Sequence, residues 1–446
     1  MRRAARYLSL FGPLLVVLAF SKVHAAFVAD PPYDYTASFR FAWSLGYAVA
    51  LGLAAYGLGL PELARTRRQL LQQTLVASLV AAIAVSVVQL LVGDALLPRF
   101  VVLGAAIGVI PVHGVSWMLA RHGIVRDESR DRVVLIGSET DRADLVVDLD
   151  RSPEQPAILV AHVVADAAVG STAMDKPLIG LVLEAGATVL VLDRSALAVE
   201  QVIEQASPLH EAGVRVRTLL EFYEEWLGKL PVSELERASL FFDISEIHRQ
   251  RYGRAKRLVD IACALAGVVL LVLAVPLVLV GNLIGNRGGL LYRQERVGRG
   301  GGTFDILKFR TMVPAGSGEA DTSWTKPGDA RITAFGGFLR KSHLDELPQV
   351  INILRGDLSV VGPRPEQPRY VTELSAKLPF YGMRHLVRPG LTGWAQVKYG
   401  YAGDETDALQ KLQYEFFYLR HQSLRFDLRI IGRTVRSIMG SEGAGR

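Results

Sequence analysis

Asp345 and Glu346 form a pair of adjacent acidic residues within the run Leu339–Gln349. Pro348 fits easily only in the first turn of a helix, so the sequence predicts a helix that begins close to Asp345 and runs to Arg355–Gly356. Both carboxylates would lie at its N-terminus, where the helix dipole favours negative charge. Adjacent helical residues point about 100° apart, so one carboxylate can be an ionised nucleophile while the other binds a hard cation such as Mg²⁺. Taken alone, such a pair is equally typical of a helix cap or a solvated surface.

Basic residues in stiff or β-like backbone contexts accompany this pair. They are Lys308, Arg310, Arg340, Arg364 and Arg388. The planar guanidinium of arginine can bind two phosphate oxygens at once, so the pattern favours a phosphate-bearing substrate. Gly298–Gly302 lacks the G-x-x-x-x-G-K-[ST] pattern of a phosphate loop and is typical of a hairpin turn. His343 and His385 could exchange protons, but packing or surface roles fit them better.

These candidate residues occupy the last third of a chain whose composition indicates a membrane protein facing a reducing compartment. Half of the 446 residues are hydrophobic and only 21% are charged, which is unusually apolar for a wholly soluble protein. The 50 basic and 44 acidic residues leave a net charge of +6. Cys263 is the single cysteine, which excludes an internal disulfide framework and a thiolate metal cluster. The nine histidines show no paired spacing typical of zinc sites.

Four apolar stretches in the first 120 residues each approach the ~20 residues that cross a bilayer. They are Tyr7–Phe27, Phe39–Leu60, Leu71–Val92 and Phe100–Ala120. Arginines cluster before the first stretch, between the second and third, and after the fourth, so the positive-inside rule places the N-terminus and everything after Arg121 in the cytoplasm. The alternative for the first stretch is a cleaved signal peptide, but its removal would leave three spans and conflict with the charge bias.

Between about residues 131 and 230, short β-branched runs alternate with polar helical stretches. This pattern predicts a small parallel sheet with strands at Arg132–Gly137, Ala157–Val163, Thr188–Asp193 and Val214–Leu219. At the end of the first strand, only Gly137 remains of the G-x-G-x-x-G fingerprint, because Glu139 and Arg142 replace the other glycines. A structural or regulatory Rossmann-like domain is therefore favoured over a nucleotide site.

Leu258–Gly285 is a fifth apolar segment, with basic residues on both sides and Pro276 inside it. If the segment crossed the membrane, the whole C-terminal third would be exported against the charge bias. Pro276 removes a backbone hydrogen bond and can kink a helix. These features favour a helix that enters the membrane, bends at Pro276 and returns to the same side, over an ordinary spanning helix.

The last helical segment, about residues 424–438, interleaves apolar residues with four arginines. A basic amphipathic helix of this kind can lie on an anionic membrane surface. The alternative is a helix that packs on its own domain and keeps a solvated basic face.

Six motifs in fixed order resemble those of the bacterial sugar transferases, also called polyprenyl-phosphate sugar-1-phosphate transferases or monotopic phosphoglycosyl transferases. The motifs are Arg257–Asp260, Tyr292–Gly298, Lys308–Met312, Leu344–Gln349, Gly356–Pro365 and Arg388–Trp394. The resemblance covers about residues 250–440, and the whole layout resembles large members with four N-terminal spans and a Rossmann-like insert. Residues 365–401 and 412–418 further resemble exopolysaccharide-initiating, exosortase-associated members. Val275 departs from the pattern, because some members have serine before the proline of the re-entrant helix.

This resemblance implies an enzyme that transfers sugar-1-phosphate from a UDP-sugar to undecaprenyl phosphate and releases UMP, as the first step of exopolysaccharide assembly. Asp345 would attack the β-phosphorus and become a sugar-phosphoryl-aspartate. Glu346 matches the family's Mg²⁺-associated acid, and Arg340 matches the arginine, five residues before the nucleophile, that holds phosphate. Together with Arg340, the basic residues expected to neutralise phosphate charge are Lys308, Arg310, Arg364 and Arg388.

The expected fold is a four-span α-helical membrane bundle over residues 1–125, an α/β Rossmann-like domain over residues 126–235, and an α/β monotopic catalytic domain over residues 236–446. The re-entrant helix is expected at about residues 255–285, with its kink at Pro276. The N-terminus and the catalytic domain would face the cytoplasm at the bacterial inner membrane, with membrane lipid as a partner. A homodimer is a further expectation, nucleic acid is not an expected partner, and the motifs do not identify the sugar.

Two other functions compete with this interpretation. A membrane nucleotide-sugar dehydratase would need a glycine-rich loop and a Tyr-x-x-x-Lys pair in one α/β domain, whereas the pair Tyr252–Lys256 lies in the basic flank of the fifth apolar segment. A catalytically silent scaffold for glycan assembly would be expected to lack Asp345 or Glu346, and both are present.

Overall fold

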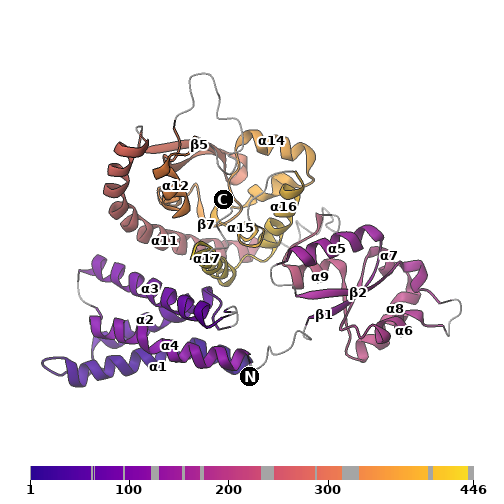
Figure 1. Cartoon of the computed structure of the whole chain (residues 1–446), viewed down its shortest axis with the longest axis horizontal. Coiled ribbons are helices and arrows are strands. Elements are labelled where there is room, and N and C mark those ends of the chain that lie inside the picture. The colour runs from indigo at the N-terminus through magenta and orange to yellow at the C-terminus, as the bar shows by residue number, and fades with distance from the viewer. Residues whose placement is uncertain are drawn as a thin grey trace.

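The computed structural model divides the chain into a helical bundle, a parallel-sheet domain and a C-terminal domain (Figure 1). It describes residues 2–61, 64, 66–93, 96–121, 130–152, 156–170, 175–232, 246–286, 289–313, 331–399 and 405–439. The domain boundaries predicted near residues 125 and 235 lie outside these described residues.

The bundle contains four helices joined in sequence. They are α1 (Arg2–Val23), which continues as the π-helix η1 (His24–Val28), α2 (Phe39–Gly57), α3 (Arg67–Val92) and α4 (Arg99–Arg121). Small residues let α1 and α4 approach closely, since a Cβ added to Gly104 would lie 2.4 Å from the Phe20 ring. The core combines Tyr47 of α2 with Ala81 of α3 and Ala105 of α4.

Four helices in the described residues are long and apolar enough to cross a membrane, which indicates a membrane protein. They cover Tyr7–Val28, Arg67–Gln89, Arg99–Ala120 and Tyr252–Gly281. Three of them match the first, third and fourth stretches predicted in the bundle. The second stretch forms α2, a helix of 19 residues that packs in the bundle and carries Arg40, but it is not among the four candidates. The fourth candidate is the segment predicted to be re-entrant.

The parallel-sheet domain has four strands in the order β2-β1-β3-β4. The strands are β1 (Asp131–Ile136), β2 (Ala157–Val163), β3 (Val189–Leu192) and β4 (Arg215–Thr218), which confirms the four predicted positions and their parallel pairing. Helical segments cover both faces: α5 (Glu139–Arg151), η3 (Ala165–Ala168), α6 (Pro177–Glu184), α7 (Arg194–Leu197), α8 (Glu200–Glu211), α9 (Leu219–Phe222) and η4 (Tyr223–Leu227). Two apolar cores, one per face, follow from the alternation along the strands.

The turn between β1 and α5 carries an internal anion. The Asp193 carboxylate accepts the Ser138 backbone N–H at 3.2 Å, and a Cβ added to Gly137 would lie 3.0 Å from Asp193. A dinucleotide-binding fold places a pyrophosphate at this turn, against the first turn of the helix. Here the chain supplies its own carboxylate at that place.

The C-terminal domain is built around two short sheets. Its elements are α11 (Glu246–Gly281), η6 (Asn282–Asn286), β5 (Leu291–Val297), η7 (Arg299–Gly301), β6 (Thr303–Phe309), α12 (Ala334–Lys341), η8 (Leu344–Glu346), α13 (Gln349–Arg355), β7 (Ser359–Val361), α14 (Pro368–Lys377), η9 (Tyr381–Leu386), β8 (Gly390–Thr392), α15 (Trp394–Lys398), α16 (Glu405–Arg420) and α17 (Leu424–Met439). Strands β5 and β6 form an antiparallel hairpin, and β7 pairs with β8 in parallel. Gly300 and Gly301 adopt positive φ at the hairpin turn, which confirms the turn predicted there.

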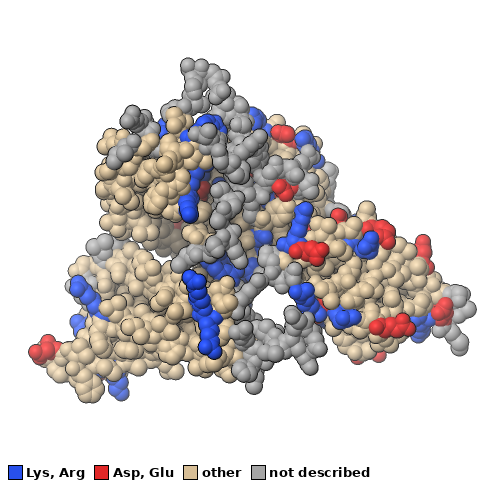
Figure 2. All heavy atoms as spheres, viewed as in Figure 1, with Lys and Arg blue, Asp and Glu red and all other residues tan. Residues whose placement is uncertain are grey.

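Helix α11 contacts the C-terminal domain on both sides of Pro276. Before the proline, Ala264 packs against the core of α13, and after it Val278 packs against Phe309 and Leu339. The opposite face leaves large apolar residues exposed, such as Leu273 at 70%. Figure 1 shows α11 curving around one side of this domain, and in Figure 2 the surface there is almost free of charge.

Helix α17 lies between its own domain and the bundle. Phe426 and Ile430 are buried in the domain core, and Gly432 meets Gly57 at the end of α2 so closely that an added Cβ would lie 1.9 Å from the Gly57 backbone. Arg425 donates a hydrogen bond to the Tyr56 hydroxyl at 2.6 Å. Of the two alternatives predicted for this helix, the contacts match packing on its own domain.

The parallel-sheet domain is fastened to the C-terminal domain by buried polar contacts. Lys229, at 1% exposure, pairs with Asp148 of α5 at 2.5 Å and donates to Gln410 of α16 at 2.8 Å. The Trp394 indole N–H donates to the Gly228 carbonyl at 2.7 Å. The cost of removing the Lys229 charge from water is offset only while both partners stay in place.

Candidate active site

The two carboxylates lie on a short 3₁₀ turn, η8, between α12 and α13. His343 adopts a left-handed backbone with φ of 57° at the start of this turn. The predicted α-helix starts later than expected, because the first turn is 3₁₀ and α13 begins only after Pro348, at Gln349. Its predicted end is confirmed, since Gly356 terminates α13 with φ of 97°.

Glu346 is held by two cations from different elements. Lys308 of β6 donates to its Oε1 at 2.7 Å, and Arg364, which follows β7, approaches the same oxygen at 3.5 Å. Burial alone would raise the pKa of Glu346, but Lys308 and Arg364 outweigh it and hold the pKa far below its usual range. Glu346 is therefore an anion at every physiological pH.

Asp345 has the opposite electrostatic environment. Its side chain is only 8% exposed, and burial together with the neighbouring Glu346 charge raises its pKa from 3.8 to about 6, although Lys308 and Arg340 act against the rise. The two adjacent carboxylates thus differ in their affinity for a proton. Asp345 is ionised at neutral pH but more basic than an ordinary aspartate, which suits a nucleophile.

The structure brings three of the five predicted basic residues to this pair. Lys308 and Arg364 touch Glu346, and the Arg340 guanidinium, which donates to the Thr311 hydroxyl at 2.9 Å, lies close enough to lower the pKa of Asp345. The Arg310 side chain donates to the Gly289 carbonyl at 2.8 Å.

Arg388 has a different set of neighbours from these residues. Burial and the nearby Arg257 and Arg299 lower its pKa, whereas Asp260 raises it. Phosphate binding by all five basic residues, including Arg310 and Arg388, stays a prediction.

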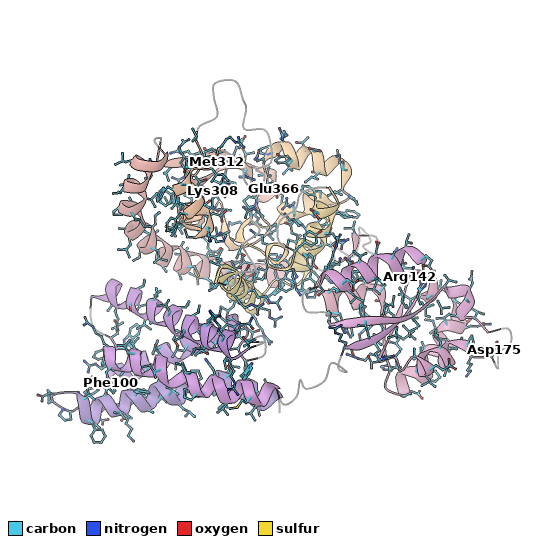
Figure 3. The ribbon with its side chains drawn as sticks, viewed as in Figure 1. Phe100, Arg142, Asp175, Lys308, Met312 and Glu366 are labelled. Carbon is cyan, nitrogen blue, oxygen red and sulfur yellow. The ribbon has the colours of Figure 1, made fainter. Side chains whose placement is uncertain are left out.

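A small recess opens beside Glu346. Besides Lys308 and Arg364, its lining includes Gln349 and Arg296. Sequence reasoning singled out neither residue. The signal for Gln349 was its place at the end of the Leu344–Gln349 motif, and the structure shows this residue buried, at 3% exposure. Figure 3 shows Lys308 inside the C-terminal domain, well apart from Arg142 and Asp175 of the parallel-sheet domain.

The side chains at this site fit a magnesium ion that takes some of its ligands from a substrate. Among the described residues no three acids, histidines or cysteines gather into a metal cage. Mg²⁺ is usually held by one or two carboxylates together with substrate phosphates and water. Lys308 and Arg364 approach Oε1 of Glu346, and no described side chain hydrogen-bonds to Oε2, which leaves one carboxylate oxygen for a cation.

The residues that could have supported other chemistry have packing roles. Burial lowers the pKa of His385 to about 4, and its ring packs edge-on against Tyr381. Tyr252 and Lys256, the pair that a dehydratase would need, both donate to Asp427 of α17, at 2.7 and 2.8 Å. They join the start of α11 to α17.

Comparison with known proteins assigns the domain that carries this site. The profile of the family "Bacterial sugar transferase" matches residues 251–441. A UDP-glucose:undecaprenyl-phosphate glucose-1-phosphate transferase of Caulobacter vibrioides is 41% identical over 194 residues, which are 42% of this chain and 71% of that protein. The chain belongs to the bacterial sugar transferase family.

Two longer relatives align over the same domain. A UDP-N-acetylgalactosamine-undecaprenyl-phosphate N-acetylgalactosaminephosphotransferase of Aeromonas hydrophila is 41% identical over 196 residues, 43% of this chain and 45% of that protein. A UDP-glucose:undecaprenyl-phosphate glucose-1-phosphate transferase of Xanthomonas campestris pv. campestris is 39% identical over 234 residues, 51% of this chain and 46% of that protein. The matched part therefore spans less than half of each of these two relatives.

Proposed function

We propose that this sugar transferase moves a sugar-1-phosphate from a UDP-sugar to undecaprenyl phosphate through a covalent intermediate on Asp345. The observation that carries the proposal is the pair of unlike carboxylates: a buried, basic Asp345 next to a Glu346 held ionised by Lys308 and Arg364. A nucleophile beside clustered cations is what phosphoryl transfer requires. The activities named for the relatives point to the same reaction.

In the first step, an Asp345 carboxylate oxygen attacks the β-phosphorus of the UDP-sugar. The bond from that phosphorus to the bridging oxygen breaks, UMP leaves with that oxygen, and a sugar-phosphoryl-aspartate remains. In the second step, a phosphate oxygen of undecaprenyl phosphate attacks the same phosphorus. The acyl-phosphate P–O bond breaks, which regenerates the Asp345 carboxylate and gives undecaprenyl-diphosphate-sugar.

The cations around the carboxylates let two anions approach each other. Arg340 and Arg364 offer guanidinium groups to the phosphate oxygens, and Lys308 keeps Glu346 ionised and in place. Glu346 would hold Mg²⁺, which would supply further positive charge against the phosphate oxygens. Glu346 is thereby a ligand and Asp345 the reacting group.

We further propose that α11 is re-entrant and kinks at Pro276. Support comes from its contacts, since both halves pack on the same domain while the opposite face is apolar and exposed. A straight spanning helix would carry its far end ~30 Å away across the hydrocarbon. With the basic loops inside, the active site lies at the cytoplasmic face of the bacterial inner membrane, where a soluble nucleotide-sugar meets a lipid acceptor.

The biological role proposed is the first step of exopolysaccharide assembly, with a glucose, galactose or N-acetylated hexose as the transferred sugar. A homodimer and a structural or regulatory role for the Rossmann-like domain belong to the same proposal. Support for the latter is the Asp193 carboxylate at the turn where a nucleotide phosphate would bind.

The test is UMP release from a panel of UDP-sugars by purified protein with Mg²⁺ and undecaprenyl phosphate. We expect release with one sugar class, a phosphosugar adduct on the peptide containing Asp345 when the lipid is omitted, and neither in Asp345→Asn. Release by Asp345→Asn at the wild-type rate would refute the intermediate. No release by folded wild-type protein from any UDP-sugar would favour the scaffold function.

A further inference from the structure

The segment Pro363–Glu366 is held by an unusual set of contacts. Its four consecutive carbonyl oxygens accept hydrogen bonds from four different donors: Gly390 N at 2.8 Å, Arg384 Nη2 at 2.8 Å, Arg296 Nη1 at 3.1 Å and Val297 N at 2.9 Å. Two of the four residues are prolines, which have no N–H to donate. The segment therefore depends on other elements for its position, and it carries Arg364, whose side chain reaches Glu346.

Two of these four donors are arginine side chains, and Arg384 is more deeply buried than Arg296. The charge of Arg384 is paired with a buried carboxylate. Arg384 is 5% exposed, and its Nε and Nη2 bind the two oxygens of Glu415 on α16 at 2.9 and 2.7 Å. Its Nη1 donates to the Tyr381 hydroxyl at 2.6 Å. The second hydrogen on Nη2 is the one directed at the Arg364 carbonyl. The bidentate ion pair with Glu415 fixes the plane of the Arg384 guanidinium. The second hydrogen on Nη2 therefore has a fixed direction.

We infer that Arg384 is a positioning residue for the transfer reaction, acting on Glu346 and the substrate phosphate through the backbone of Arg364. The inference rests on the proposed function for its catalytic consequence. A lysine at position 384 could still neutralise Glu415, but a single ammonium cannot hold both carboxylate oxygens and the Arg364 carbonyl in one plane. The Arg364 side chain would then lose its defined approach to the site, and small displacements of positioning groups are costly in phosphoryl transfer.

The first experiment is a double-mutant cycle on UMP release, with Arg384→Lys, Arg364→Ala and the double variant. We expect Arg384→Lys alone to lower kcat/KM about ten-fold, and to change it less than about two-fold when Arg364 is already alanine. Arg369→Lys, the same substitution at an exposed position on α14, should leave kcat/KM unchanged. Additive losses in the cycle would overturn the inference, because they would mean that Arg384 acts independently of Arg364.

A second measurement does not depend on activity. Phenylglyoxal modifies accessible arginines, and the adduct on Arg364 can be followed by peptide mass spectrometry. We expect this adduct to form several-fold faster in Arg384→Lys than in wild type or Arg369→Lys, with melting temperatures that agree. An unchanged rate at Arg364 would overturn the positioning role. Absence of UMP release from wild-type protein would instead refute the proposed function. The phenylglyoxal measurement would still test whether Arg384 positions Arg364.

Discussion

Replacing Asp345 with asparagine should stabilise the protein while abolishing transfer. A rise in the pKa of Asp345 from 3.8 to about 6 means that the folded state disfavours its charge by ~3 kcal/mol, at roughly 1.4 kcal/mol per pKa unit. The folded protein binds this proton more tightly than the unfolded chain does. Stability therefore falls as pH rises from about 4 to 6, and the full penalty persists above pH 6. Asparagine carries no charge, so the variant escapes the penalty.

The assay is thermal unfolding of both proteins in the same detergent between pH 4 and pH 8. We expect equal melting temperatures near pH 4 and a gap that opens to roughly 6 °C or more above pH 6, in favour of Asp345→Asn. Asp305→Asn, on the exposed side of β6, is the matched control and should track wild type throughout. A variant that is less stable than wild type at pH 8, or a gap independent of pH, would refute the electrostatic account of the site.

Three other perturbations test separate parts of the molecule. The value of kcat/KM should fall ten-fold per pH unit below about pH 6, where Asp345 takes up its proton. Lys308→Met should move this fall to higher pH, because Lys308 lowers the pKa of Asp345, and should cut kcat/KM about 10²-fold. A pH profile that does not shift in Lys308→Met would contradict the role of Lys308. In a Cys263→Ser background, Thr303→Cys should resist an impermeant maleimide in intact cells and react after lysis, whereas labelling from outside would exclude a re-entrant α11. Gly432→Leu should abolish bismaleimide crosslinking between cysteines placed at Tyr56 and Arg425, because its side chain would occupy the place of the Gly57 backbone; persistent crosslinking would contradict that contact.

Local sequence patterns were sufficient for the elements whose stability is local. The strand positions of the parallel sheet follow from β-branched runs, and the hairpin turn at Gly298–Gly302 follows from glycines that tolerate positive φ. The start of α13 was predicted too early because a proline restricts where a helix can begin without deciding between a 3₁₀ and an α turn. Similarly, α2 forms a helix as predicted, but with 19 residues and Arg40 near its start it is not among the helices that are long and apolar enough to cross a membrane.

In the active site, too, the features set by local sequence could be predicted and those set by tertiary contacts could not. Asp345 and Glu346 could be identified from adjacency and from the order of motifs, but their unlike proton affinities depend on Lys308 from one sheet and Arg364 beside another. No spacing rule relates those elements, because their separation in sequence says nothing about which oxygen each cation reaches. Burial of Asp345 is also a tertiary property, since a helix-capping aspartate would show the same letters in the sequence.

Residues that position the side chains of the site without touching the substrate are still harder to predict from sequence. Arg384 and Glu415 look like ordinary surface charges of η9 and α16, yet both are buried and their pairing fixes the carbonyl of Arg364. Such a pair costs solvation energy that an apolar pair would not. The presence of this pair is explained if the N–H that Arg384 directs at the Arg364 carbonyl contributes more to the reaction than an apolar pair would contribute to stability. A paired replacement, Arg384→Met with Glu415→Leu, should therefore fold at least as well as wild type and still transfer sugar-phosphate about ten-fold more slowly. Wild-type kcat/KM in that double variant would show that the ion pair is structural only.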